Sequence, residues 1–117
     1  MRTDGIPTIN GVGLIPDLRN SSQFRSNAGF LNFGEEPCTV YWQLVGHVGA
    51  ATEGQTQAVP AYGWVQISDV FGKAGVGAWE HAWMNITAQG GPVWAYGSVV
   101  DNGSNDPTSL PMVKLMP

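Results

Sequence analysis

The sequence predicts an all-β domain, an antiparallel β-sandwich of about seven to nine strands. Glycine and proline occupy 16 and 8 of the 117 positions, so the chain lacks uninterrupted segments long enough for extended helices. The apolar residues fall in short runs that turn residues separate, which is typical of strands. Only 12% of the residues are charged whereas 43% are hydrophobic, a balance that argues against disorder. The whole chain, residues 1–117, fits a single domain.

The first part of the chain contains five of the predicted strands. They are Gly11–Ile15, Phe24–Phe33, Cys38–Val45, Thr56–Val59 and Trp64–Ile67. Pro16 and the polar loop Asp17–Gln23 end the first strand, and the turn at residues 34–37 ends the second. The third strand gives the clearest pattern, because β-branched and aromatic side chains alternate along it. The turn at residues 61–63 separates the last two strands.

One short helical turn is predicted near residues 69–74. The hydroxyl of Ser68 can cap this turn by accepting a hydrogen bond from a free backbone amide, and the glycines that follow end it. The next segment, Ala78–Gln89, fits both helical spacing and strand alternation. We favour the strand, because Gln89-Gly90-Gly91 supplies a tight hairpin connection and the run that follows it, Val93–Val100, is apolar and aromatic.

The chain closes with a predicted turn at Asn102–Pro107 and a last strand at Leu110–Met116. Pro111 interrupts this strand and has no backbone N–H to donate, which suits the edge of a sheet. Alternation along the strands also predicts which side chains point into the core. These are Phe30, Val40, Trp42, Leu44, Ile67, Met84, Ile86, Val93, Ala95 and Val99.

Several short motifs follow one another in a distinctive order. They are FRSNAGFLN at Phe24–Asn32, then Val40, Pro60, DVF at Asp69–Phe71, GPVWAYGSVVDN at Gly91–Asn102, DPT at Asp106–Thr108 and finally Pro111. In this order the chain resembles, over residues 12–111, a family of bacterial secreted or surface β-sandwich modules that often occur in tandem. The resemblance implies an immunoglobulin-like sandwich from an exported bacterial protein, and it implies no reaction. Ser26, where threonine is common, and the many tryptophans depart from the family pattern.

The resemblance is the basis for the expected cellular location of the protein. An extracellular or cell-surface location is the expectation, although residues 1–7 contain no apolar run typical of a secretion signal. Nine acidic and five basic residues give a net charge of −4, so the sequence lacks the basic footprint of a protein that binds nucleic acid or an anionic membrane. No apolar run approaches the roughly 20 residues of a membrane span.

Little in the sequence points to catalysis, and we expect no enzyme activity and no cofactor. Cys38 is the single cysteine, so no internal disulfide can form. It could in principle pair with His47 or His81 as a nucleophile, but a small thiol at the start of a strand is ordinarily a buried core residue. Glu35 and Glu36 are neighbours in a turn and are expected to point into water rather than to form an acid–base pair.

One loop offers a possible calcium site. Residues 101–106 carry carboxylate, amide, hydroxyl and carbonyl oxygens, which are the ligands that calcium prefers. Asp, Asn and Gly also form such turns without a metal, and the loop lacks the spacing of an EF-hand. We expect a structural turn and no metal site.

The five tryptophans are the unusual feature of the composition. If Ala78–Gln89 is a strand, Trp79, His81 and Trp83 project from the face opposite the core, and Tyr41 can share that surface. Exposed aromatic rings can stack on sugar rings or anchor a protein interface. They can also simply cover the open side of a sheet.

We therefore predict a non-catalytic structural or adhesive module of an exported bacterial protein. It would associate with itself, as a symmetric dimer, or with neighbouring protein modules. The alternative is a carbohydrate-binding module, in which Trp79, Trp83 and Tyr41 form a platform for glycans.

Overall fold

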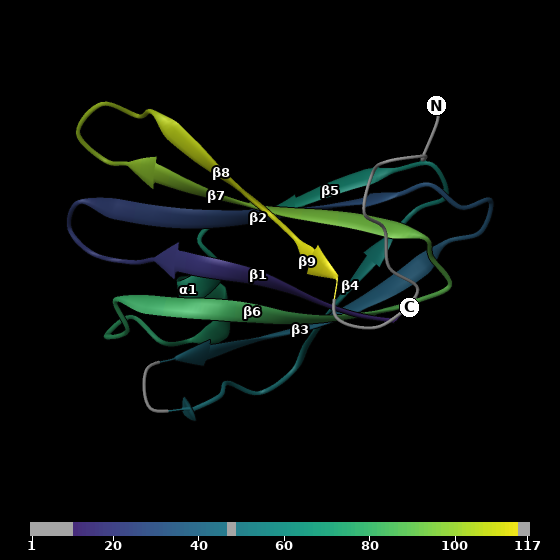
Figure 1. Cartoon of the computed structure of the whole chain (residues 1–117), viewed down its shortest axis with the longest axis horizontal. Helices are drawn as coiled ribbons and strands as arrows, with labels where there is room; N and C mark the ends of the chain where they lie inside the picture. Colours follow the sequence, from purple (N-terminus) through teal and green to yellow (C-terminus); the bar gives the residue numbers. More distant parts are fainter. Residues whose placement is uncertain (1–10, 47–48, 115–117) are drawn as a thin grey trace.

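The computed structural model describes residues 11–46 and 49–114, which form two antiparallel β-sheets packed face to face (Figure 1). One sheet has five strands in the order β4-β3-β6-β1-β9, and the other has four in the order β5-β2-β7-β8. The strands are β1 (Val12–Arg19), β2 (Phe24–Asn32), β3 (Cys38–Gly46), β4 (Gln55–Val59), β5 (Trp64–Ile67), β6 (His81–Gln89), β7 (Val93–Asp101), β8 (Pro107–Pro111) and β9 (Val113–Lys114). The predicted all-β sandwich is thus confirmed, whereas its immunoglobulin-like character stays a prediction. His47 and residues 1–7, on which two expectations rest, lie outside the described ranges.

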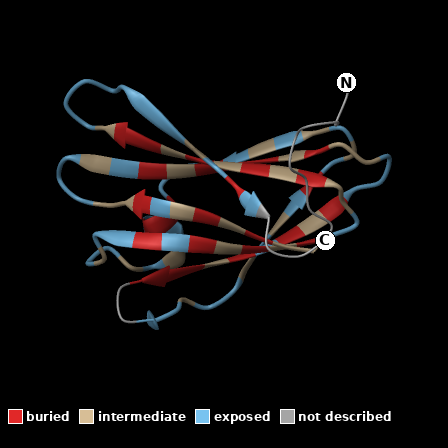
Figure 2. Ribbon diagram, viewed as in Figure 1, coloured by how far each residue is buried: buried red, intermediate tan, exposed pale blue. Residues whose placement is uncertain are grey.

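The core lies between the two sheets, and its side chains come from alternate positions of each strand. All ten side chains that the alternation predicts to point inward are buried. Figure 2 shows the alternation along β6, where buried and exposed residues follow one another. The segment that fits either a helix or a strand therefore forms a strand, although it begins at His81 rather than at Ala78.

The first strand runs further than the sequence predicts. Pro16 and Asp17 do not end β1, which continues to Arg19. Ile15 pairs with Met84 and Leu18 pairs with Ala82, so β1 uses three steps where β6 uses two, which is a β-bulge. The extra residue turns Leu18 back toward the core, and both Ile15 and Leu18 are fully buried.

The short helix α1 (Val70–Ala74) lies where a helical turn is predicted, but its cap differs. Asp69, not Ser68, is the N-cap residue, and its carboxylate accepts a hydrogen bond from the Gly72 amide at 3.1 Å. Asp is as good a capping acceptor as Ser, and here its backbone adopts a φ of 52° that directs the side chain over the first turn. Val70 and Phe71 are buried and close the core beside the sheets.

The end of the chain crosses from one sheet to the other. The sequence predicts a turn at Asn102–Pro107 and one strand over Leu110–Met116, but β8 already begins at Pro107 and ends at Pro111. After the buried Met112, β9 pairs with β1 in the opposite sheet. Figure 1 shows this crossing as the yellow segment that joins β8 to β9. Residues 115–117 lie outside the described range.

Within the described ranges, no helix has the length and apolar character that crossing a membrane requires.

Candidate functional site

A hollow of about 750 Å³ lies at one end of the five-stranded sheet. Three elements meet there: β3 ends at Gly46, β6 begins at His81, and β1 bulges at Asp17. The lining includes Asp17, Gly46, Trp79, Glu80, His81 and Trp83. The volume falls within the range of about 300–1,000 Å³ that small-ligand sites occupy.

Of the four residues that the sequence singles out, Trp79, His81 and Trp83 line this hollow, and Tyr41 does not. In the register of the sheet Trp83 lies opposite Val45, whereas Tyr41 lies opposite Thr87. Tyr41 is therefore four residues, or about 13 Å, further along β3. It shares the outer face of the sheet with Trp83 and is 42% exposed, but the two rings do not form one platform.

Trp79 does not project from a strand, because β6 begins only at His81. It lies in the preceding loop, half-buried, and packs against the core. A Cβ atom built on Gly46 would come within 2.8 Å of the Trp79 ring, so the indole packs closely against the Gly46 backbone, where glycine leaves room for it. The Asn20 side chain donates a hydrogen bond to the Trp79 carbonyl at 2.9 Å and fixes the loop from the other side. Trp79 thus forms a rigid wall of the hollow.

Trp83 forms a second aromatic wall. It projects from the outer face of β6 and is 40% exposed. Its indole N–H donates a hydrogen bond to the side-chain oxygen of Asn85 at 3.1 Å. Asn85 lies two residues along the same strand and hence on the same face, so it holds the indole in one orientation.

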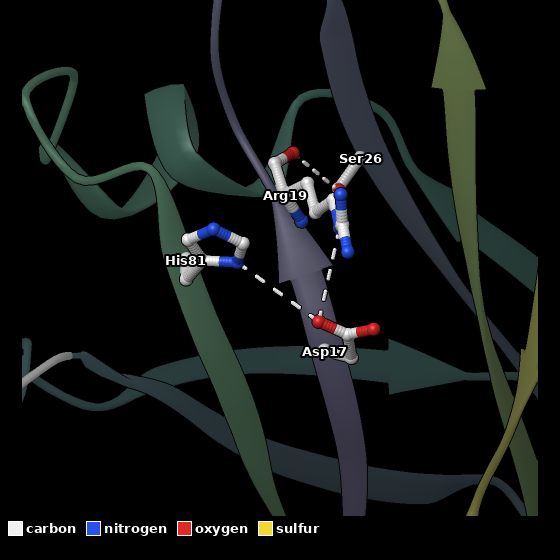
Figure 3. A network of polar contacts seen from close by, with 4 residues as sticks. All are labelled: Asp17, Arg19, Ser26 and His81. Carbon is white, nitrogen blue, oxygen red and sulfur yellow. Dashed lines mark hydrogen bonds and ion pairs between the residues drawn. The ribbon is translucent and has the colours of Figure 1, made fainter.

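The polar side of the hollow is a cluster around Asp17 (Figure 3). The Asp17 carboxylate lies 3.9 Å from the His81 ring nitrogen Nδ1 and 3.8 Å from Arg19 Nε. Asp17 has a φ of 58°, a left-handed conformation that is unusual for a residue other than glycine, and it occupies the bulge of β1. A bulge redirects a side chain, and here it places the carboxylate beside His81.

Arg19 is held in place from the second sheet. The buried Ser26 of β2 accepts a hydrogen bond from the Arg19 amide at 2.9 Å and donates one to the Arg19 carbonyl at 2.6 Å. The Arg19 guanidinium also lies over the Phe24 ring, 5.6 Å from its centre. The side chains of Asp17, Arg19 and His81 are each more than two-fifths exposed, so their ion pairs add little stability and their polar atoms stay open to a ligand.

The sequence does not single out Asp17 or Glu80 for this hollow. Proline and aspartate are residue types that commonly end a strand in a turn, so Pro16 and Asp17 are predicted to lie outside the strand. The spacing of Ile15 and Leu18 could have indicated the bulge. Core residues in a regular strand are an even number of positions apart, so two that are three apart require one extra residue between them.

The residues considered for nucleophilic chemistry are not brought together. Cys38 stands at the start of β3, where it pairs with Val59 and its neighbour Thr39 pairs with Gln89, whereas His81 stands at the far end of the sheet. Cys38 is buried, and desolvation raises the pKa of its thiol above the ordinary value, which favours the unreactive protonated form. His47 lies outside the described residues.

The loop at residues 101–106 uses its oxygens within the protein. The Asp101 carboxylate accepts hydrogen bonds from the Gly103 and Ser104 amides. The side-chain oxygens of Asn102 and Asn105 accept from the Arg25 guanidinium. In the part of the chain that the structure describes, no three His, Cys, Asp or Glu side chains are grouped so as to hold a metal ion.

No family model and no curated protein matches the chain. Among solved structures it is similar to protein 1070 of Thermotoga maritima, with a TM-score of 0.71 and 12% identity over 91% of this chain and 94% of that chain. It is also similar to the Anabaena sensory rhodopsin transducer, with a TM-score of 0.62 and 17% identity over 78% of this chain and 98% of that chain. At these identities the likeness concerns the fold alone, and the chain is a small β domain of the same general architecture.

Proposed function

We propose that the chain is a non-catalytic binding module and that the hollow at the end of the five-stranded sheet takes a carbohydrate. The observation that carries this proposal is the pairing of two fixed indole walls, Trp79 and Trp83, with the open Asp17 carboxylate in one hollow. A sugar ring has an apolar face of C–H groups and a rim of hydroxyls. Indole rings contact the apolar face of the sugar, and a carboxylate accepts strong hydrogen bonds from the hydroxyls.

The charges around the hollow disfavour an anionic ligand. Asp17 and Glu80 would repel an anion, and Arg19 beside Asp17 offsets part of the attraction that the two carboxylates exert on a cation. A neutral ligand that carries several hydroxyls avoids this repulsion. Its hydroxyls can donate to Asp17 while the apolar ring face covers Trp83.

The concave shape favours this ligand class over another protein at the same place. Anchor residues of protein interfaces usually sit in a broad contact area, whereas these indoles line an indentation where three strands meet. The association with other modules that the sequence predicts would therefore use a different surface. An exported bacterial origin, which the resemblance implies, remains part of the proposal because carbohydrates are common ligands at cell surfaces.

The test is a glycan array followed by titration calorimetry on the oligosaccharides that bind. We expect binding that weakens at least tenfold in Trp83→Ala and about tenfold in Asp17→Asn, which keeps the size of the side chain but removes its charge. Trp64→Ala removes an exposed indole from the opposite sheet and is the matched control, for which binding should be unchanged. An array without binding, or binding that survives Trp83→Ala and is lost in Trp64→Ala, would overturn the proposal.

A further inference from the structure

The four-stranded sheet has an aromatic surface of its own, which the sequence does not single out. Leu31 of β2 lies between Trp64 of β5 and Trp94 of β7, so these three side chains form a row across the sheet. In the neighbouring row Tyr96 lies opposite Pro111 of β8. Side chains that lie directly opposite in a sheet share a face, and this face points away from the core. We call these five residues the aromatic face.

The aromatic face is rigid. The Trp94 and Tyr96 rings stack with their centres 5.2 Å apart and their planes 29° from parallel. The Trp64 indole N–H donates a hydrogen bond to the Tyr96 hydroxyl at 3.1 Å, and that hydroxyl contacts the Gln66 side-chain oxygen at 3.3 Å. The Tyr96 ring also covers Gly29, where a Cβ atom would collide with it. A surface fixed in this way loses little conformational entropy when it binds.

The surface is nevertheless accessible. Trp64 is 56% exposed, and Pro111 is also exposed at the outer edge of the sheet. Trp94 and Tyr96 are half-buried. Rigid aromatic rings at a surface, without a charge among them, are typical anchors of protein interfaces.

The charged residues at the two ends of β2 indicate which protein can bind to the aromatic face. Arg25 lies near one end of β2 on the outer face, opposite Val100, and Glu35 and Glu36 follow the other end. The row of Trp64, Leu31 and Trp94 lies between these two charged ends. A second copy of the chain can be turned by 180° about an axis that passes through the aromatic face. The turn of this copy that contains Glu35 and Glu36 then lies beside Arg25 of the first copy. The same contact then occurs again at the other end, as a two-fold interface requires.

We propose that two copies of this chain associate through their aromatic faces in a two-fold, antiparallel arrangement. The strands β5, β2, β7 and β8 contain 4, 9, 9 and 5 residues, so a rise of about 3.3 Å and a strand spacing of about 4.8 Å give a face of roughly 430 Å² per copy. The resulting total of about 860 Å² belongs to the small interfaces of weak complexes, so we expect a dimer with a dissociation constant of about 100 μM. The hollow proposed to take a carbohydrate lies on the other sheet and stays open in this dimer.

Sedimentation equilibrium between about 1 and 200 μM tests the dimer. We expect a monomer–dimer equilibrium that weakens at least tenfold in Trp94→Ala. Trp83→Ala, which removes an indole from the other sheet, is the matched control and should leave the equilibrium unchanged. A monomer throughout this range, or a dimer that depends on Trp83 and not on Trp94, overturns the proposal. Binding of a polysaccharide or of another protein by a monomeric aromatic face does so as well.

A charge exchange tests the antiparallel arrangement. Arg25→Glu alone, and Glu35→Lys combined with Glu36→Lys in a second variant, should each weaken self-association, because both place like charges together at the two ends of the interface. An equimolar mixture of the two variants should form the dimer again, since each end then joins opposite charges. A mixture that stays monomeric overturns the arrangement, and this result is independent of any carbohydrate binding in the hollow.

Discussion

Asn32 is the most informative position for testing how the sandwich is held together. It is a buried polar residue, 2% exposed, at the end of β2. Its side-chain amide donates hydrogen bonds to the carbonyls of Glu36 at 2.8 Å and Val59 at 3.3 Å, and its oxygen accepts from the Gly34 amide at 2.8 Å. One side chain thus joins β2, the turn before β3 and the end of β4.

The substitution Asn32→Asp keeps the size of the side chain but replaces the donating amide group with an oxygen. At pH 7 this oxygen is ionised and faces two carbonyl oxygens in the core. Two lost hydrogen bonds contribute about 1 kcal/mol each, and an unpaired buried charge is the larger part of a total loss of about 3–5 kcal/mol in the free energy of unfolding.

The loss depends on pH with a defined sign. In the unfolded chain the introduced carboxyl titrates near its ordinary value of about 3.9, whereas burial beside the carbonyl oxygens raises its pKa in the folded protein. At pH 3 the group is protonated in both states and its O–H can donate to the Glu36 carbonyl, so the loss should fall to about 1 kcal/mol. Stability is then lost as the pH rises above about 4, until the group also ionises in the folded protein.

Urea unfolding of wild type and variant at pH 3 and pH 7 measures this difference. Asn105→Asp is the matched control, because it adds the same charge at an exposed position whose oxygen already accepts from Arg25, and its effect should stay within about 0.5 kcal/mol. Equal losses for Asn32→Asp at the two pH values, or a loss below about 1 kcal/mol at pH 7, would refute the reasoning.

Two further substitutions or modifications test the core. A Cβ atom at Gly97 would lie 2.7 Å from Ile15 Cγ2 and 2.9 Å from Leu18 Cδ2, so Gly97→Ala should destabilise the protein by about 1–3 kcal/mol through overpacking. Thermal unfolding followed by circular dichroism measures this, and an unchanged midpoint would contradict the close approach of β7 to β1. The buried Cys38 thiol, whose pKa is raised by desolvation, should react with a thiol reagent at pH 8 only after denaturant is added. Rapid reaction of the native protein would show that this end of β3 is open to solvent.

The strands were predictable where the pattern is local. In β3, Val40, Trp42 and Leu44 alternate with more exposed residues, and burial follows this alternation directly. The bulge in β1, by contrast, cannot be predicted from the local sequence pattern alone. Whether Asp17 ends a strand or occupies a bulge depends on how Leu18 pairs with Ala82, more than sixty residues away. The crossing at Met112 likewise depends on the second sheet, which a single segment does not reveal.

The same distinction holds for the two surfaces. The alternation along one strand points to Trp83 and His81, and both side chains line the same hollow. The sequence does not reveal the row of Trp64, Leu31 and Trp94, because these residues belong to three strands whose order in the sheet is set by tertiary pairing. Residue types and local alternation indicate aromatic recognition in general, but only the topology assigns the aromatic residues to two surfaces on different sheets.

The bulge at Pro16 and Asp17 has a consequence beyond the site. Among the residues that the structure describes, β9 pairs with β1 only at Gly13 and Leu14, and no other described strand lies beside the rest of this β1 margin. An intruding strand from another molecule would meet a proline without an N–H, a kinked backbone and a charged side chain there, three features that discourage edge-to-edge aggregation. The prolines of β8 protect the margin of the other sheet in the same way. Fibre-like stacking through strand addition is thereby disfavoured.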